Sequence, residues 1–359
     1  MEIVMTKGRQ FSKRRAIPLL LVTTWLLSTN LHAETQTDVL RKPVGKGAYE
    51  LVYSQGDNSL YVATSQSRSL DKGGIVYRLD PQTLNITQII HNDAKPFGAT
   101  INSQTGVLYF TNTTNNALTA IDAKTDEVKG RLVLDERKRS ETVKPLSPRE
   151  VVADTATDTV YVTGLGEASV VWVVNGKDLT LRDTIKDTGK YGTGLALDSA
   201  AKRLYVTNAE GELVTIDTAT NKVLTRKKLD ADKEHFFLNI SLDTATHRAF
   251  ITDSKQAQVL VVDTRDGNVL HRIDVPESLG ILFNPQREEV YVTHRQAGEV
   301  SVIDAKTYKV LKTIKLPVYP NSLALSPDGQ VLYVSVKQAS TRDKEATEPD
   351  DVVRIDLKS

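Results

Sequence analysis

Few side chains beyond residue 33 have the types and spacing that catalysis or cofactor binding requires. The 359-residue chain contains no cysteine, which excludes disulfides, thiolate catalysis and cysteine-bound zinc or iron–sulfur clusters. The HExxH, CxxCH and GxSxG spacings of zinc proteases, c-type haem proteins and serine hydrolases do not occur either. We therefore expect a protein that is not an enzyme and that carries no cofactor.

Acidic residues that end apolar runs at regular intervals are a second candidate for chemistry. They stand, with one asparagine among them, at Asp80, Asp122, Asn175, Asp217, Asp263, Asp304 and Asp356. Asp or Asn followed by small polar residues also forms a turn in which the side chain accepts backbone N–H groups. Because Asn175 replaces a carboxylate, we interpret these positions as turns and not as an acid–base site.

The elements that carry these residues repeat seven times. Each unit contains a run of the LYVT type, whose aromatic residues are Tyr61, Tyr109, Tyr161, Tyr205, Phe250, Tyr291 and Tyr333. A turn-forming Ser, Asn or Asp stands seven residues before each aromatic residue, which indicates a hairpin of fixed register. A third apolar run and a more polar fourth run follow. Each unit therefore predicts four short strands, a to d, as in a propeller blade.

The two ends of the chain complete the seventh unit. The last unit stops at Asp356, the end of its strand c, and residues 39–44 resemble the strand d that it lacks. We therefore predict an all-β fold over residues 34–359. It is a seven-bladed β-propeller of four-stranded antiparallel blades, closed by the N-terminal strand, and this closure removes open sheet edges.

Residues 1–33 have the pattern of a signal peptide. Five basic residues precede the apolar run AIPLLLVTTWLL, and Leu31-His32-Ala33 is an acceptable cleavage site. A membrane anchor is the weaker alternative, because the apolar run is short. Cleavage would change the net charge from +1 to about −3, which does not favour general attraction of nucleic acid.

The repeat resembles a known family. The sequence YVTN at residues 205–208, together with KGAYELVYS, KPFGATIN and KEHFF, resembles the YncE-like periplasmic propeller proteins of Gram-negative bacteria. The resemblance covers the signal peptide and all seven units. It implies a non-enzymatic periplasmic propeller with affinity for DNA and no membrane insertion after signal cleavage.

Strand directions place the d–a and b–c loops on one face, which we call the loop face. Three loops are enlarged, at residues 65–74, 134–150 and 337–351. The first and the last belong to neighbouring blades of the closed ring, so we expect them side by side at the channel mouth. Function commonly resides on such loops, although insertion-tolerant surface loops are the alternative.

Aromatic and cationic residues alternate on the loop face, as single-stranded nucleic acid requires for stacking and for phosphate contacts. The candidate binding residues are Lys46, Arg68, Lys95, Arg137, Lys138, Arg139, Arg149, Lys190, Tyr191, Phe236, Arg295, Tyr319 and Lys337. We expect a monomer that binds single-stranded DNA. Because acidic residues are about as numerous on these loops, an envelope protein is the alternative partner.

A metal- or cofactor-dependent enzyme would need His91, His235 and His294 to converge over the channel. These three histidines are predicted on the loop face, but in well-separated parts of the ring. His294 occupies a position that Asn, Gly or Asp holds in other units, which suggests a left-handed turn residue instead of a metal ligand.

Overall fold

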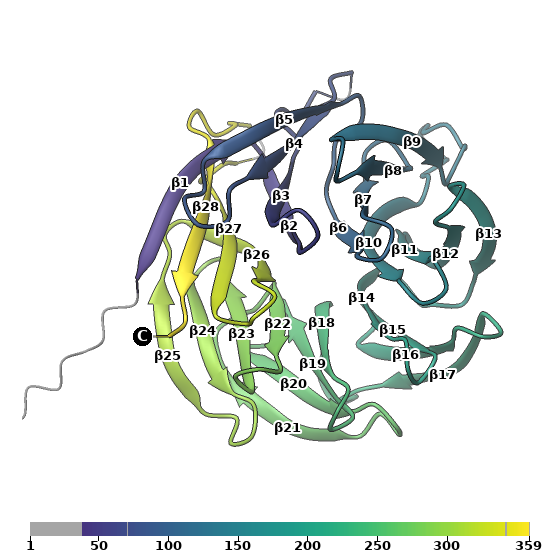
Figure 1. Ribbon diagram of the computed structural model, residues 1–359. Helices are drawn as coiled ribbons and strands as arrows, with labels where there is room; N and C mark the ends of the chain where they lie inside the picture. The colour runs from purple at the N-terminus through teal and green to yellow at the C-terminus, as the bar shows by residue number, and fades with distance from the viewer. Residues whose placement is uncertain (1–37, 70, 342, 359) are drawn as a thin grey trace, which may run out of the picture. The chain divides into compact units, whose positions relative to one another are not determined.

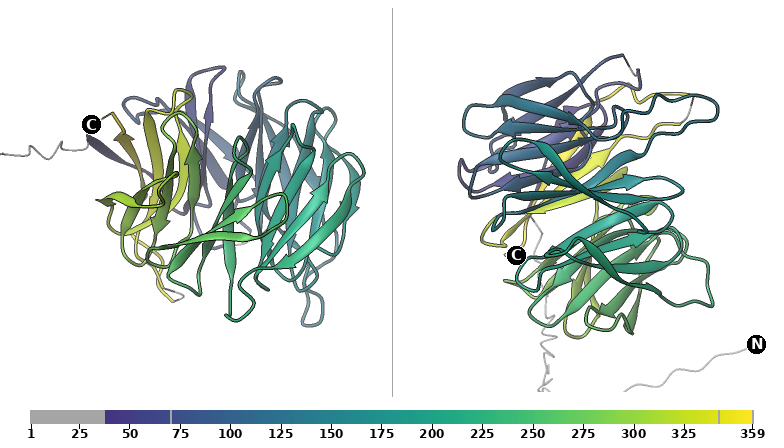
Figure 2. Two further views of the ribbon diagram at one scale, coloured as in Figure 1. Left: turned by 90° about the horizontal axis from the view of Figure 1, so that it is seen from below. Right: turned by 90° about the vertical axis from the view of Figure 1, so that its right-hand side faces the viewer.

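The computed structural model describes residues 38–69, 71–341 and 343–358, which form seven four-stranded antiparallel sheets arranged in a ring (Figure 1). The predicted signal peptide lies outside the described residues. Side views show that the connections between strands gather at the two faces of the ring (Figure 2). Among the described residues, no helix is long and apolar enough to cross a membrane.

The strands of each blade are given from the innermost outwards. Blade one contains β2 (Ala48–Ser54), β3 (Ser59–Thr64), β4 (Gly74–Leu79) and β5 (Ile86–Asn92). Blade two contains β6 (Ala99–Asn102), β7 (Val107–Asn112), β8 (Ala117–Asp122) and β9 (Glu127–Val133). Blade three contains β10 (Ser147–Asp154), β11 (Thr159–Leu165), β12 (Val170–Asn175) and β13 (Thr180–Ile185). Blade four contains β14 (Gly192–Asp198), β15 (Arg203–Asn208), β16 (Glu212–Asp217) and β17 (Lys222–Lys228).

The last three blades follow the same order. Blade five contains β18 (Phe237–Asp243), β19 (Arg248–Asp253), β20 (Gln258–Asp263) and β21 (Val269–Asp274). Blade six contains β22 (Ile281–Asn284), β23 (Glu289–His294), β24 (Glu299–Asp304) and β25 (Val310–Lys315). Blade seven contains β26 (Tyr319–Leu325), β27 (Val331–Lys337), β28 (Asp350–Asp356) and β1 (Val39–Gly45).

The N-terminal strand closes the ring, as the sequence predicts. Strand β1 pairs antiparallel with β28, and Arg41 lies opposite Val353 in the register. Arg41 also forms an ion pair of 2.6 Å with Asp351. Blade seven is therefore assembled from both ends of the described chain.

In several blades the repeated tyrosine, or the threonine two residues after the aromatic position, binds a neighbouring blade. The hydroxyl of Tyr109 in blade two donates to the carbonyl of Gly176 in blade three, at 3.1 Å. The buried Thr252 in blade five accepts the N–H of Asn239 in its own blade and donates to Leu279 O of blade six at 2.8 Å. The repeat therefore encodes hydrogen bonds between blades as well as a core.

The strand-c acidic positions form turns, which confirms the structural interpretation over an acid–base site. One side-chain oxygen accepts the N–H two residues later at each of Asp80, Asp122, Asn175, Asp217, Asp263, Asp304 and Asp356. A carboxylate saturated in this way keeps its negative form, and the pKa of Asp304 is lowered by the backbone N–H of Thr307.

Candidate ligand-binding site

The inner strands surround a chamber of about 270 Å³ on the ring axis. Its polar walls carry Glu50 from β2, Arg149 and Glu150 from β10, and Arg295 from the loop after β23. The apolar walls carry Leu51, Leu195, Ile240, Leu279, Ile281 and Leu323. A chamber of mixed character of this kind is typical of small-molecule sites.

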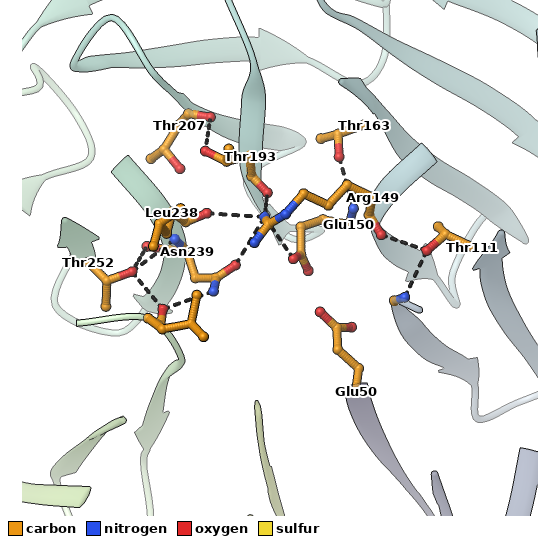
Figure 3. A network of polar contacts seen from close by, with 12 residues as sticks. Glu50, Thr111, Arg149, Glu150, Thr163, Thr193, Thr207, Leu238, Asn239 and Thr252 are labelled. Atoms are coloured by element: carbon orange, nitrogen blue, oxygen red, sulfur yellow. Dashed lines mark hydrogen bonds and ion pairs between the residues drawn. The ribbon is translucent and has the colours of Figure 1, made fainter. Parts of the chain in front are cut away.

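Arg149, a predicted phosphate-binding residue, crosses the chamber to other blades. Its guanidinium donates to the carbonyl oxygens of Thr193 in blade four and Leu238 in blade five, and to Asn239 Oδ1 (Figure 3). It also lies 3.0 Å from Glu150 Oε1. The donors of Arg149 are thus directed at internal acceptors.

The carboxyl groups of Glu50 and Glu150 face one another in the chamber (Figure 3). Glu50 Oε2 accepts the N–H of Ala99 at 2.8 Å. Burial raises the pKa of Glu50 well above its ordinary value, and the hydrogen-bonded Glu150 carboxyl raises it further. Two adjacent carboxylates do not both ionise readily, so this arrangement favours the protonated form of Glu50.

The mouth of the chamber places Lys337 on the ring of Tyr49. The Lys337 Nζ lies 3.9 Å from the ring centroid, 2.9 Å from Ala48 O and 3.4 Å from Asp350. Burial lowers the pKa of Lys337 to about 8. Tyr49 in turn contacts the ring of Phe97, with 4.5 Å between centroids.

The two enlarged loops of blades one and seven lie side by side, which confirms the predicted rim. Arg68 donates its backbone N–H to Glu345 Oε1 at 3.0 Å, and its guanidinium lies 3.8 Å from the same carboxylate. Lys95 is buried and donates to Ser65 O at 3.1 Å. Lys46 is exposed on the same rim. The rim therefore carries mixed charge.

Arg295 differs from the other cations of the chamber. Its guanidinium lies 5.8 Å from the ring centroid of Tyr319, and no described carboxylate forms an ion pair with it. It lowers the pKa of the neighbouring Lys337 through charge repulsion. Arg295 thus leaves positive potential at the chamber wall that no described acidic group neutralises.

The third enlarged loop forms a separate groove of about 640 Å³ against blade three, which we call the lateral groove. Its charged lining consists of Arg137, Arg139, Lys144, Glu167, Lys186 and Asp187. Arg137 is bound to Asp135 Oδ2 at 2.6 Å, and Asp135 also accepts the N–H of Leu146 at 2.7 Å. Asp135 therefore holds both ends of the loop together, and Lys138 is exposed beside Arg139.

Tyr191 stands at the edge of the lateral groove in an unusual backbone conformation. Its φ of 49° is left-handed, which is uncommon for a bulky side chain. Its hydroxyl donates to Glu167 at 2.5 Å, and Lys190 lies 2.8 Å from the same carboxylate. The ring of Phe236 is stacked beside it, with 6.5 Å between centroids. Of the predicted binding residues, Arg137, Arg139 and Tyr191 line this groove, and Lys190 and Phe236 lie beside Tyr191.

The structure does not bring the three histidines together. His91 is exposed on the outer strand β5, whereas His235 and His294 are buried in blades five and six. His235 contacts Asp253 at 2.5 Å, and Phe236 N–H binds the same carboxylate. In the described part of the chain, no group of three or more His, Cys, Asp or Glu side chains is arranged to hold a metal.

The prediction that His294 is a left-handed turn residue is wrong. His294 ends strand β23 and does not belong to the residues with positive φ. Its ring is buried, with Nδ1 at 3.0 Å from Pro276 O and Nε2 at 2.8 Å from the Ser301 hydroxyl. His294 thus binds the incoming d–a segment, and Asn208 does the same in blade four by donating to Thr188 O.

Sequence reasoning missed Glu50 as a chamber residue, and Lys144 and Lys186 as groove residues. Glu50 stands within a strand that looks like any other strand a, and no spacing links it to Glu150. Lys144 follows the basic run in the same enlarged loop, so the length of that loop could have indicated Lys144 as a groove residue. Lys186 reaches the groove only through the packing of blade three.

The comparisons with known proteins identify the family. The chain is 66% identical over 339 residues to the YncE protein of Salmonella typhimurium, covering 94% of this chain and 96% of the relative. The YncE protein of Escherichia coli (strain K12) gives the same identity and coverage. A domain of unknown function, DUF5074, matches residues 45–224, and a family model described as outer membrane protein assembly factor BamB matches residues 160–326.

A solved structure shows the same fold. The Swd1 β-propeller domain of Myceliophteria thermophila superposes with a TM-score of 0.69 at 9% sequence identity, covering 90% of this chain and 100% of that domain. At that identity the likeness concerns the fold alone. The identity to the two enterobacterial relatives extends over nearly their whole length, and the chain belongs to the YncE family of β-propeller proteins.

Proposed function

We propose that the protein is a periplasmic, non-catalytic monomer that binds an extended anionic polymer in the lateral groove, with single-stranded DNA as the favoured ligand. The observation that carries the proposal is the charge of the groove. Arg139, Lys144 and Lys186 are exposed there, and no described carboxylate is recorded in an ion pair with them. They therefore remain available for phosphate groups.

The aromatic side chains beside the groove support the same ligand. Tyr191 lines the groove and Phe236 stacks next to it, so a base has a ring surface within reach of the cations. Base–aromatic stacking contributes about 1–3 kcal/mol per base and tolerates any sequence. We infer binding without strong sequence preference.

The channel mouth is the less favourable place for phosphates. Arg149, Lys95 and Lys337 direct their donors at internal oxygens. Releasing them would leave buried acceptors unpaired, which costs free energy. We therefore place the polymer along the lateral groove and not through the channel.

The test is anisotropy of a fluorescent single-stranded oligonucleotide with the chain that starts at residue 34. The variant Arg139→Glu/Lys144→Glu reverses two groove charges, and Lys124→Glu/Lys177→Glu reverses two exposed charges on turns of the opposite face. Arg137 is left intact because it neutralises Asp135. Saturable binding that only the groove variant loses supports the proposal. Absence of binding near about 50 mM salt, or equal loss in both variants, contradicts it.

A protein partner is a second candidate function, favoured by the mixed charge of the rim. Arg68 pairs with Glu345 there, and Tyr49 is half-buried beside Lys337. The family model named after an outer membrane assembly factor matches residues 160–326, which also fits an envelope scaffold. The test is capture of an envelope protein by the wild type and by two variants. Capture that is lost in Arg68→Glu and kept in Arg139→Glu/Lys144→Glu would favour this function over nucleic-acid binding.

A further inference from the structure

The chamber on the ring axis carries opposite charges on different walls. Arg295 lies on the wall of blades six and seven, and the Glu50 and Glu150 carboxyl groups lie on the wall of blades one and three. Arg295 has no described acidic partner, whereas Arg149 lies 3.0 Å from Glu150 Oε1 and its charge also acts on Glu50. Arg149 offsets part of the charge of the carboxyl wall, whereas no described carboxylate forms an ion pair with Arg295 on the opposite wall.

The space between these walls suits a small amphipathic molecule. The chamber of about 270 Å³ lies just below the usual size of drug-sized ligand pockets, about 300–1,000 Å³. Six leucine and isoleucine side chains supply an apolar surface, and Asn321 and Ser322 add neutral polar groups to the lining. A ligand with a charged group at each end and an apolar body would match the charged walls with its ends and the apolar surface with its body.

We propose that this chamber binds a small zwitterion, such as an amino acid or a short peptide, with its carboxylate at Arg295 and its ammonium group between Glu50 and Glu150. A guanidinium recognises a carboxylate by charge-assisted hydrogen bonds. Two carboxylates recognise an ammonium group in the same way. This site is separate from the lateral groove, and the proposal does not rest on polymer binding there.

The proton of the carboxyl pair gives the site a specific signature. Burial and the Glu150 carboxyl raise the pKa of Glu50, and the other titratable groups that line the chamber are Tyr49, Arg149 and Arg295. Before a ligand binds, burial therefore favours the protonated form of Glu50. An ammonium group between the two carboxyl groups favours the ionised form instead, so binding releases protons to the buffer.

The experiment is titration calorimetry of the chain from residue 34 with three probes: L-leucine, leucyl-leucine and 6-aminohexanoate. These probes hold ammonium and carboxylate at different separations. N-acetyl-leucyl-leucine and leucyl-leucinamide, each with one charge removed, are the controls. We expect at least one zwitterion to bind saturably, with each control more than about tenfold weaker. Failure of all three zwitterions to bind, or equal affinity for a control, overturns the proposal.

Variants locate the binding in the chamber. Arg295→Gln should weaken the zwitterion more than about tenfold, Arg295→Lys should restore part of the affinity, and Arg139→Gln in the lateral groove should leave it unchanged. The heat should depend on the ionisation enthalpy of the buffer in the wild type and lose that dependence in Glu50→Gln. Unchanged affinity in Arg295→Gln, or a wild-type heat independent of the buffer, contradicts the assignment. Oligonucleotide binding by the same variants shows separately whether the groove proposal holds.

Discussion

Glu50 on β2 and Glu150 on β10 direct their carboxyl groups at one another in the chamber, although their strands belong to blades one and three. Neither residue is isolated, because Ala99 N–H binds Glu50 and the Arg149 guanidinium lies beside Glu150. The pair therefore connects the inner strands of several blades, and it makes the stability of the ring depend on pH.

The pH dependence of this pair has a defined sign. The pKa of Glu50 is higher in the folded protein than its ordinary value of 4.5. Above pH 4.5 the folded state therefore binds more protons than the unfolded state does. The stabilising contribution is complete below that value and is lost as the pH rises through the folded pKa. Glu50→Gln should remove this loss, which urea unfolding of both proteins from pH 4 to pH 9 measures. Parallel curves for the two proteins would contradict the raised pKa of Glu50.

The threonine bridges between blades should contribute to stability. Thr252→Val removes the hydroxyl that donates to Leu279 O and accepts the N–H of Asn239. The partly buried Asn239 N–H then loses this acceptor, while Leu279 O keeps the hydrogen bond from the Asn239 side-chain amide. We expect a decrease of about 1–3 kcal/mol in the free energy of unfolding. The exposed strand residue Thr225 offers the matched control, Thr225→Val. Equal unfolding midpoints for the two variants would show that the bridge contributes nothing.

Asp135 should determine the order of the loop that forms the lateral groove. Its carboxylate binds the Arg137 guanidinium and the N–H of Leu146, and these contacts lower the pKa of Asp135. Asp135→Ala should increase amide hydrogen exchange in residues 136–147 while the blade cores stay protected. Glu141→Ala, an exposed change in the same loop, is the control. The account fails here if exchange in that segment stays as slow as in the control.

Lys337 should titrate well below an ordinary lysine. Burial against Tyr49 lowers its pKa to about 8, while the nearby Asp350 opposes the shift. The expected result is one lysine resonance that titrates near pH 8 in NMR spectra of protein labelled at the lysine ε-carbon. Lys337→Arg should delete that resonance and no other. A spectrum in which all lysines titrate near 10.5 would contradict the burial of this ammonium group.

Much of the fold could be predicted from the sequence because its signals are local. The fixed spacing between turn residue and aromatic residue defines each hairpin, and the Asp or Asn after strand c defines the next turn. The closure by β1 was predictable because its residues resemble other outer strands. These features depend on residues that are close in sequence or that repeat.

The chamber could not be predicted in the same way, because its contacts join different blades. Arg149 has the residue type of a phosphate ligand, yet its partners Thr193 and Leu238 lie in blades four and five. His294 occupies a position that small turn-forming residues hold in other units, but its buried ring forms a hydrogen bond to Pro276 O in the segment between blades five and six. The residue types along the sequence therefore predict where strands end. They do not predict which hydrogen-bond partners the side chains at those ends have.

The most direct test of the groove proposal is the slope of log affinity for single-stranded DNA against log salt concentration. Each neutralised phosphate contributes a slope of about −0.7 for a single strand, so the three groove cations Arg139, Lys144 and Lys186 predict about −2. The variant Arg139→Ala/Lys144→Ala should reduce the magnitude of the slope by about 1.4, and Lys124→Ala/Lys177→Ala should leave it unchanged. A slope that is the same in all three proteins would show that the polymer does not lie in the lateral groove.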